Sequence, residues 1–278
     1  MLKKMTVMTA DIDGTLCIKG EIPGPRTIAA IERLHKEGVL FGPASGRPMD
    51  RRILRLAQTW GLSFDFDFAI GMNGGDLYDK ETDTTEHYYQ LTGEQVKKIL
   101  TPIAHLDMNA IVYINGYDEI HAMRMDAFMQ DSINRNHSHV EIGDVDFLGQ
   151  HPTGKVEIHL KPNSLDEFMR IVNENADPSW ICIKTFQIQD HVTMEFIDPR
   201  VNKGVALKKY AENHNIPLEE IIAFGDMEND IGLIKEAGWG VCLINGADDT
   251  KAVAQAITEY PCLEDGVGRY LEDHWFNR

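Results

Sequence analysis

Residues 5–16 read MTVMTADIDGTL, and this stretch indicates how the chain is organised. Its first half is short, apolar and rich in threonine and valine, which is typical of a buried strand. Asp11 and Asp13 follow directly, and Gly14 allows a sharp turn of the backbone behind them. Alternation along an extended segment places the two carboxylates on the same side. Because adjacent carboxylates repel each other, they require a shared proton or a cation such as Mg²⁺, unless the segment is only a polar turn.

Strand and helix patterns alternate in the first and last thirds of the chain. Strand signals at 39–41 and 66–70 alternate with helical spacing at 28–35 and 53–60. The last third returns to the same alternation from Lys203 onward, and its final helical signals include residues 248–256. Alternation at this pitch indicates βαβ units around a parallel sheet, in which ligands bind beyond the carboxyl ends of the strands.

The middle of the chain has a different pattern. Val156, Ile158 and Leu160 alternate with polar residues, which predicts an antiparallel sheet with one packed face and one solvated face. The expected strands are 110–114, 155–161, 181–187 and 192–197, and the expected helices are 94–100, 123–134 and 165–175. The fold class is therefore α/β. We expect a discontinuous Rossmann-like parallel-sheet core over residues 1–81 and 191–278, with an inserted α+β cap domain over residues 82–190.

Charge and cysteine content exclude several classes of protein. The net charge of −17 repels polyanions, so nucleic acid is not an expected partner. No stretch approaches the roughly 20 apolar residues of a membrane span, so no membrane partner is expected. The four cysteines are far apart and favour reduced thiols in a cytoplasmic protein. A phosphorylated ligand would need a local positive field from a metal, Lys, Arg or backbone N–H groups.

Two further segments offer groups that bind anions. Ser45, Gly46 and Arg47 follow the second predicted strand, and a helix that starts near residue 48 adds its positive end. Lys203 begins a predicted helix, where a cation is mildly unfavourable, so we expect it to face an anion or the carboxylate of Asp11. Taken singly, these segments are also compatible with an ordinary loop and a solvated lysine.

A fourth segment is unusually acidic. Residues 224–230 read FGDMEND after another predicted strand, and a single Asp or Asn would suffice to cap the following helix. Asp226 is therefore a candidate metal ligand, and Asn229 and Asp230 are candidates for orienting its waters or Lys203. A capped acidic helix start remains the alternative.

In their order along the chain, these segments resemble the four motifs of the haloacid dehalogenase superfamily. The matching residues are Asp11-Ile12-Asp13-Gly14-Thr15, Ser45-Gly46-Arg47, Lys203-Gly204 and Gly225-Asp226 through Asp230. The large insertion between the second and third motifs resembles the α/β cap of the Cof-type branch, as do residues 71–75 and 195–207. The resemblance covers nearly the whole chain, although Asn202 stands where the family often has serine.

The resemblance implies a phosphatase that works through an aspartyl-phosphate. Asp11 would attack phosphorus, and Asp13 would protonate the leaving alcohol and then assist the attack of water. Ser45 would hydrogen-bond the transferring phosphoryl oxygens, and Lys203 would neutralise their charge.

Mg²⁺ is the cofactor that the resemblance implies. The carboxylate of Asp11, the backbone carbonyl of Asp13 and Asp226 would hold it, with Asn229 and Asp230 in support.

The implied substrate is a small phosphorylated metabolite such as a sugar phosphate, with specificity set by the cap. Arg47, Asn73 and Gly74 are the residues expected to bind it. Two alternatives remain open, a sugar phosphomutase or phosphotransferase with the same chemistry and a non-catalytic sensor of a phosphorylated ligand. Paired carboxylates also occur in glycosidases, but that chemistry gives no reason for Ser45 or Lys203.

Overall fold

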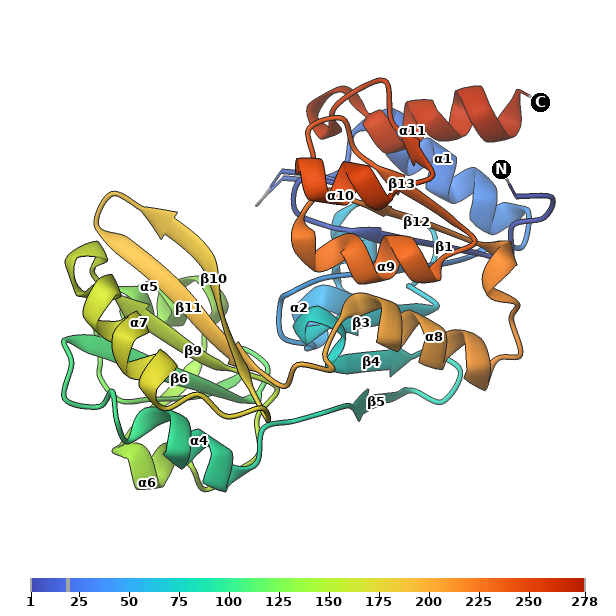
Figure 1. The fold of residues 1–278 in the computed structure, drawn as a ribbon. Coiled ribbons are helices and arrows are strands. Elements are labelled where there is room, and N and C mark those ends of the chain that lie inside the picture. The colour runs from blue at the N-terminus through green and yellow to red at the C-terminus, as the bar shows by residue number, and fades with distance from the viewer. Residues whose placement is uncertain (1, 19–20, 278) are drawn as a thin grey trace. The chain divides into compact units, whose positions relative to one another are not determined.

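The computed structural model describes residues 2–18 and 21–277, which form two compact units (Figure 1). Unit 1 comprises Met1–Glu86 and Asn202–Arg278, and unit 2 comprises His87–Val201. Both joints between the two units lie later in the chain than the boundaries expected from the sequence, which were 81/82 and 190/191. The first does so because β5 (Thr84–His87) belongs to the sheet of unit 1, and the second because β11 (His191–Ile197) pairs with strands of unit 2.

The sheet of unit 1 runs in the order β14-β13-β12-β1-β2-β3-β4-β5. Its other strands are β1 (Val7–Asp11), β2 (Leu40–Ala44), β3 (Phe68–Gly71), β4 (Asp76–Asp79), β12 (Ile221–Gly225), β13 (Trp239–Cys242) and β14 (Ala256–Ile257). The strands from β14 to β3 are parallel, and β4 turns back antiparallel to β3. β1 lies between β2 and β12, with Asp11 opposite Ala44 and Ala10 opposite Phe224. The carboxyl ends of these three strands therefore lie side by side.

Helices cover both faces of this sheet (Figure 1). Met8 and Ala10 of β1 share one hydrophobic core with Ile31 of α1 and Leu271 of α11. α8 and α9 pack together on the opposite face, where Tyr210 stacks on Phe68 with ring centroids 4.1 Å apart. The helices of unit 1 are α1 (Pro25–Lys36), α2 (Arg51–Leu54), α3 (Leu56–Thr59), η1 (Met72–Gly74), α8 (Lys203–Asn213), η3 (Leu218–Glu220), η4 (Glu228–Asp230), α9 (Ile231–Glu236), α10 (Asp248–Val253), η5 (Cys262–Glu264), α11 (Gly266–Leu271) and η6 (Glu272–Phe276). The predicted parallel-sheet core is confirmed.

Unit 2 is built on a second sheet, of order β10-β11-β9-β6-β7-β8, so the inserted α+β part of the predicted fold class is also confirmed. Its strands and helices are α4 (Gly93–Leu100), β6 (Met108–Asn115), β7 (Glu119–Ala122), α5 (Ala127–Asn136), β8 (His139–Ile142), α6 (Val145–Leu148), β9 (Val156–Leu160), η2 (Pro162–Ser164), α7 (Leu165–Glu174), β10 (Ile181–Ile188) and β11. Neighbouring strands are antiparallel except β7 and β8, which are parallel. Val156, Ile158 and Leu160 lie in one hydrophobic core with Val96 of α4 and Phe168 of α7.

The prediction of a solvated second face is wrong for β9. Glu157 and His159 are both buried, and His159 Nε2 lies 2.7 Å from Glu157 Oε1. Lys155 Nζ lies 3.1 Å from Glu157 Oε2 and 2.6 Å from Glu195 Oε1. Phe128 of α5 packs edge-on against His159, with ring centroids 3.9 Å apart. The charged side chains on this face are therefore buried in pairs of opposite charge, which offsets part of the cost of removing them from water.

Several predicted helices have different bounds, and the helix expected over 53–60 is divided into α2 and α3 at Arg55. The helix expected over 123–134 begins at Ala127, because Asp126 accepts a 2.8 Å hydrogen bond from the backbone N–H of Met129 and caps it. The helix expected over 248–256 ends at Val253, because Ala256 and Ile257 pair with β13. Within the described part of the chain, no helix has both the length and the apolar character needed to cross a bilayer.

Candidate active site

Asp11 is the last residue of β1, and its side chain is buried between the ends of β2 and β12. Lys203, the first residue of α8, is fully buried and its ammonium contacts Asp11 Oδ1. The same Nζ lies 2.5 Å from Asp230 Oδ1. Asp230 is fixed in turn, since its Oδ2 accepts hydrogen bonds from the backbone N–H groups of Asp226 (2.9 Å) and Met227 (3.1 Å). The start of α8 and the turn after β12 thus hold a cation against the carboxylate of β1.

Negative charge exceeds positive charge at this point. Asp11, Asp226 and Asp230 are all buried, and each offers a carboxylate oxygen within 4.8 Å of the others. Burial, together with the nearby charge of Asp230, raises the pKa of Asp11 to about 8 against the attraction of Lys203. Burial also raises the pKa of Asp226 to about 6, although a hydrogen bond from Thr15 opposes the change. Three buried carboxylates beside one ammonium match the oxygen ligands that a hard divalent cation prefers.

The turn after β1 holds Asp226 in place. Thr15 Oγ1 donates a 2.7 Å hydrogen bond to Asp226 Oδ1. Gly14 has a φ of +96°, and a Cβ at this position would collide with the Asp226 carboxylate. Asn245 Nδ2 donates a 2.9 Å hydrogen bond to the backbone carbonyl of Gly14. These roles of Thr15 and Asn245 were not predicted from the sequence. Thr15 lies within the motif of residues 11–15, whereas Asn245 follows β13 and has no motif around it.

Asp13 and Arg47 form a two-pronged ion pair. Arg47 Nη2 lies 2.6 Å from Asp13 Oδ1, and Arg47 Nε lies 3.0 Å from Asp13 Oδ2. Both side chains are partly exposed. Arg47, predicted to bind substrate, therefore orients Asp13 here, and the Asp13 side chain lies outside the carboxylate group formed by Asp11, Asp226 and Asp230.

Ser45 directly follows β2 and is buried. Its Oγ accepts a 3.2 Å hydrogen bond from the backbone N–H of Arg47, and its own N–H donates to the carbonyl of Ile70 at 2.8 Å. The hydroxyl keeps its donor proton for another partner.

The remaining predicted residues lie where η1 meets the starts of α8 and η4. Asn229 Nδ2 donates a 3.0 Å hydrogen bond to Asn73 Oδ1. Gly74 has a φ of +101°, and a Cβ there would collide with the backbone carbonyl of Asn202. Asn202 caps α8, since its Oδ1 accepts a 3.0 Å hydrogen bond from the N–H of Val205. The structure thus links Asn73 to Asn229 and explains Gly74 by close packing against the residue before Lys203.

The chain matches known proteins over almost its whole length. A family model described as haloacid dehalogenase-like hydrolase matches residues 8–271. The 5-amino-6-(5-phospho-D-ribitylamino)uracil phosphatase YcsE of Bacillus subtilis is 43% identical over 280 residues, covering 97% of this chain and 95% of the relative. YitU, a phosphatase of the same description from that organism, is 28% identical over 276 residues, covering 99% of each chain.

Structural comparison agrees with the sequence match. The crystal structure of TM0651 from Thermotoga maritima has a TM-score of 0.83 to this chain at 24% identity, covering 97% of each. At that identity the likeness shows the fold alone, and the family follows from the sequence match. The resemblance seen in the motifs is thereby confirmed, and the chain belongs to the haloacid dehalogenase-like hydrolases as a phosphatase of the Cof type.

Proposed function

We propose that this protein hydrolyses the phosphate monoester of a small metabolite through an aspartyl-phosphate on Asp11, with Mg²⁺ as cofactor. The observation that supports this proposal is the buried carboxylate of Asp11 at the end of β1, in contact with Lys203 and close to Asp226 and Asp230. A carboxylate at a strand end can approach a phosphoryl group directly, and a buried ammonium beside it offsets the charge of the incoming anion.

The reaction proceeds in two displacements. In the first, an oxygen of Asp11 forms a bond to phosphorus while the bond from phosphorus to the leaving alcohol oxygen breaks, and Asp13 gives that oxygen a proton. In the second, a water molecule gives a proton to Asp13 and attacks phosphorus, and the bond to Asp11 breaks to release inorganic phosphate. Arg47 keeps the Asp13 carboxylate oriented throughout, through its two contacts of 2.6 and 3.0 Å.

Two residues bind the phosphoryl oxygens in this scheme. Lys203 neutralises their charge, because its ammonium is buried beside Asp11. Ser45 donates its hydroxyl proton, since its Oγ already accepts from the N–H of Arg47.

The residues that would hold Mg²⁺ are Asp11 and Asp226 by their carboxylates and Asp13 by its backbone carbonyl. The excess of buried carboxylates over ammonium groups supports this assignment. Asp230 fixes Lys203 and the backbone of the Asp226 turn, and Asn229 supports the same turn through Asn73. When bound, the ion supplies Lewis-acid neutralisation of the transferring phosphoryl group.

The substrate class is a phosphorylated sugar or polyol. YcsE and YitU are named for a phosphoribityl compound, in which a sugar alcohol carries the phosphate. Unit 2 sets which compound is accepted, as the resemblance to capped relatives implies. Replacing residues 87–201 by the corresponding segment of a family member that prefers a different substrate should then shift the ranking of substrates toward that of the donor, and an unchanged ranking would remove this role from unit 2.

The test is a measurement of phosphate release by the purified protein with Mg²⁺ and with EDTA. The panel contains 5-amino-6-(5-phospho-D-ribitylamino)uracil, sugar phosphates, polyol phosphates, nucleotides and pyridoxal phosphate. We expect metal-dependent release, strongest on the phosphoribityl compound or another phosphorylated polyol. Phosphate transfer that requires a sugar bisphosphate would instead indicate a mutase, and binding without release would indicate a sensor.

A further inference from the structure

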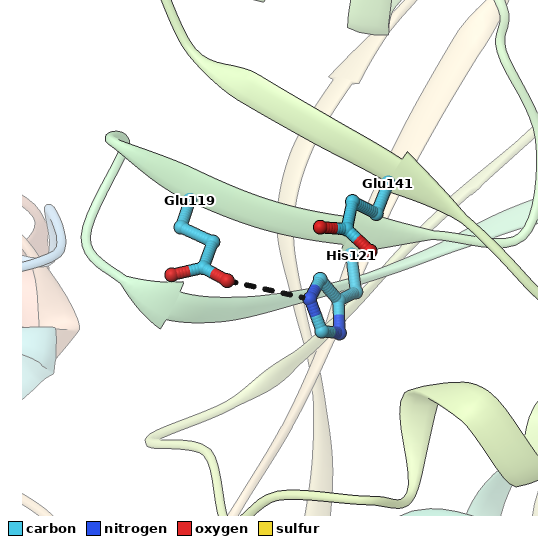
Figure 2. A group of neighbouring side chains, drawn as sticks. All are labelled: Glu119, His121 and Glu141. Carbon is cyan, nitrogen blue, oxygen red and sulfur yellow. Dashed lines mark ion pairs between the residues drawn. The ribbon is translucent and has the colours of Figure 1, made fainter.

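Glu119, His121 and Glu141 of unit 2 extend from one face of its sheet toward a common point (Figure 2). β7 and β8 pair in parallel, and His121 lies opposite Glu141 in their register. Glu119 lies two residues before His121 on β7, so its side chain points to the same face. One ligand atom from each of the three residues lies within 4.8 Å of the others. Strand pairing therefore brings one imidazole and two carboxylates together at the edge of this sheet.

His121 is buried against Phe147, and one of its two ring nitrogens has no hydrogen-bond partner in the described part of the chain. It is 4% exposed, and its ring stacks on Phe147 with centroids 4.4 Å apart and an interplanar angle of 26°. Its Nε2 faces Glu119 Oε1 at 3.8 Å, which is beyond hydrogen-bond distance (Figure 2). Nδ1 is buried and has no hydrogen-bond partner among the described residues. The ring nitrogen on the side of the glutamates is Nε2, which is close to Glu119 but makes no hydrogen bond to it, so this atom is available to a ligand bound between His121 and the two carboxylates.

The two carboxylates can adapt to an ion. The side chains of Glu119 and Glu141 are 41% and 47% exposed, so they can rotate and an ion can enter from solvent. Ligand atoms roughly 2.0–2.2 Å from a tetrahedral Zn²⁺ ion lie roughly 3.3–3.6 Å from each other. The present spacing of up to 4.8 Å closes to this value through small rotations of the two glutamates. The solvent side leaves a position for a water molecule as a fourth ligand.

We propose that Glu119, His121 and Glu141 bind a transition-metal ion of the Zn²⁺ class, separate from the carboxylate site of unit 1 and independent of the proposed function. An imidazole ligand favours Zn²⁺ over Mg²⁺, which prefers oxygen ligands. A second imidazole, that of His139, lies opposite Glu119 in the strand register, and its Nε2 is 3.2 Å from Glu141 Oε1. The ion would join β8, the edge strand of the sheet, to β7 through side chains of both strands.

The first experiment titrates Zn²⁺ into the full-length protein against a chromophoric chelator, with Mg²⁺ in excess to occupy the oxygen-ligand site of unit 1. We expect one Zn²⁺ ion to be retained per chain. The double variant Glu119→Gln/Glu141→Gln should weaken Zn²⁺ binding at least about tenfold. Both side chains are partly exposed, so the variant should remain folded. The matched control is Glu259→Gln, which removes the carboxylate of an exposed Glu–His pair in unit 1, 2.8 Å from His274, and should leave Zn²⁺ affinity unchanged.

The second experiment locates the ion by NMR of the histidine ring nitrogens. One equivalent of Zn²⁺ should shift the signal of His121, identified by its loss in His121→Gln. Three results would overturn the proposal: no Zn²⁺ retained in excess Mg²⁺, equal Zn²⁺ affinity in wild type and the double variant, or an unshifted His121 signal. Any of them would leave Glu119 and His121 as a contact between a carboxylate and a buried imidazole on β7.

Discussion

Asp11 lies where a carboxylate is poorly solvated, because the end of β1 buries it beside Asp226 and Asp230. Burial raises its pKa to about 8, even though Lys203 attracts the ionised form. The ionised carboxylate therefore lowers the stability of the metal-free protein, while the proposed chemistry depends on it. A substitution at Asp11 should therefore affect enzymatic activity and folding stability differently, and the two can be measured separately.

Replacing Asp11 with Asn should remove activity without loss of stability. An amide cannot displace the leaving alcohol, so Mg²⁺-dependent phosphate release should fall by on the order of 10⁴ or more. In EDTA the free energy of unfolding should stay the same or rise, because the change removes a buried negative charge. Initial rates and urea unfolding measure the two effects, with Asp249→Asn on the exposed side of α10 as the control for both. An active Asp11→Asn protein would remove Asp11 from the role of nucleophile.

At the scale of elements, the position of α8 depends on its contact with η1. Gly74 of η1 has a φ of +101°, and its Cα faces the backbone of Asn202 and Lys203 so closely that no Cβ fits. Because the contacted atoms are backbone, they cannot move aside as a flexible side chain could. Any displacement there would move Lys203 away from Asp11 and Asp230.

Gly74→Ala should therefore reduce both stability and activity. We expect a loss of about 1–3 kcal/mol in the free energy of unfolding, and a lower rate of phosphate release that follows the shift of Lys203. Gly38→Ala is the matched control, since Gly38 has a φ of +87° and nothing within 4 Å of the added Cβ. It should cost only about 1–2 kcal/mol of backbone energy and leave the rate of phosphate release unchanged. Equal activity in the two variants would contradict the role of this contact.

Elements with a strong period were predictable from sequence, and short polar ones were not. The helix predicted to begin at Lys203 does begin there, as α8 (Lys203–Asn213), and Asn202 caps it. β7 and β8 are four residues each, so their alternation of polar and apolar residues is too short to identify a strand. β7 is a strand because it pairs with β6 on one side and with β8 on the other, and these pairings depend on the whole sheet.

The sequence predicted which residues form the candidate site, but not which of their side chains contact one another. The carboxyl ends of parallel strands meet at one edge, so the chemistry-bearing residues after β1, β2 and β12 could be expected near one another. Which of them touch depends on tertiary placement. Three of the contacts join segments that carry no sequence signal for being neighbours. They are the ion pair of Arg47 with Asp13 and the hydrogen bonds from Thr15 to Asp226 and from Asn245 to Gly14.

At the scale of the whole molecule, the two units have separate hydrophobic cores. One core joins the sheet of unit 1 to helices such as α1 and α11, and the other joins the sheet of unit 2 to α4 and α7. The proposed catalytic residues all belong to unit 1. Binding of Mg²⁺ at Asp11 and Asp226 should accordingly stabilise unit 1, since a ligand stabilises the unit whose folded form it binds.

That stabilisation should depend on pH in a defined direction. The pKa of Asp11 rises from 3.8 to about 8 on folding, and that of Asp226 from 3.8 to about 6, so the folded state binds protons that the unfolded state has released. Without metal, Asp11 lowers the free energy of unfolding as pH rises from about 4 to 8, and Asp226 does so from about 4 to 6, each by up to about 1.4 kcal/mol per pH unit. Mg²⁺ binds the deprotonated carboxylates, so the stability it adds should grow over the same range.

Hydrogen exchange with EDTA and with Mg²⁺, between about pH 6 and 8, measures this effect in each unit separately. Mg²⁺ should slow exchange in β1, β12 and α8, and more strongly at the higher pH. Exchange in β6, β9 and β11 should change little, because the core of unit 2 contains no residue of the carboxylate site. Asp226→Asn should remove the Mg²⁺ effect, since it deletes a proposed ligand. Equal protection of both units by Mg²⁺ would mean that the two cores unfold together. An effect of Mg²⁺ that did not vary with pH would mean that Asp11 and Asp226, whose pKa values are raised, are not its ligands.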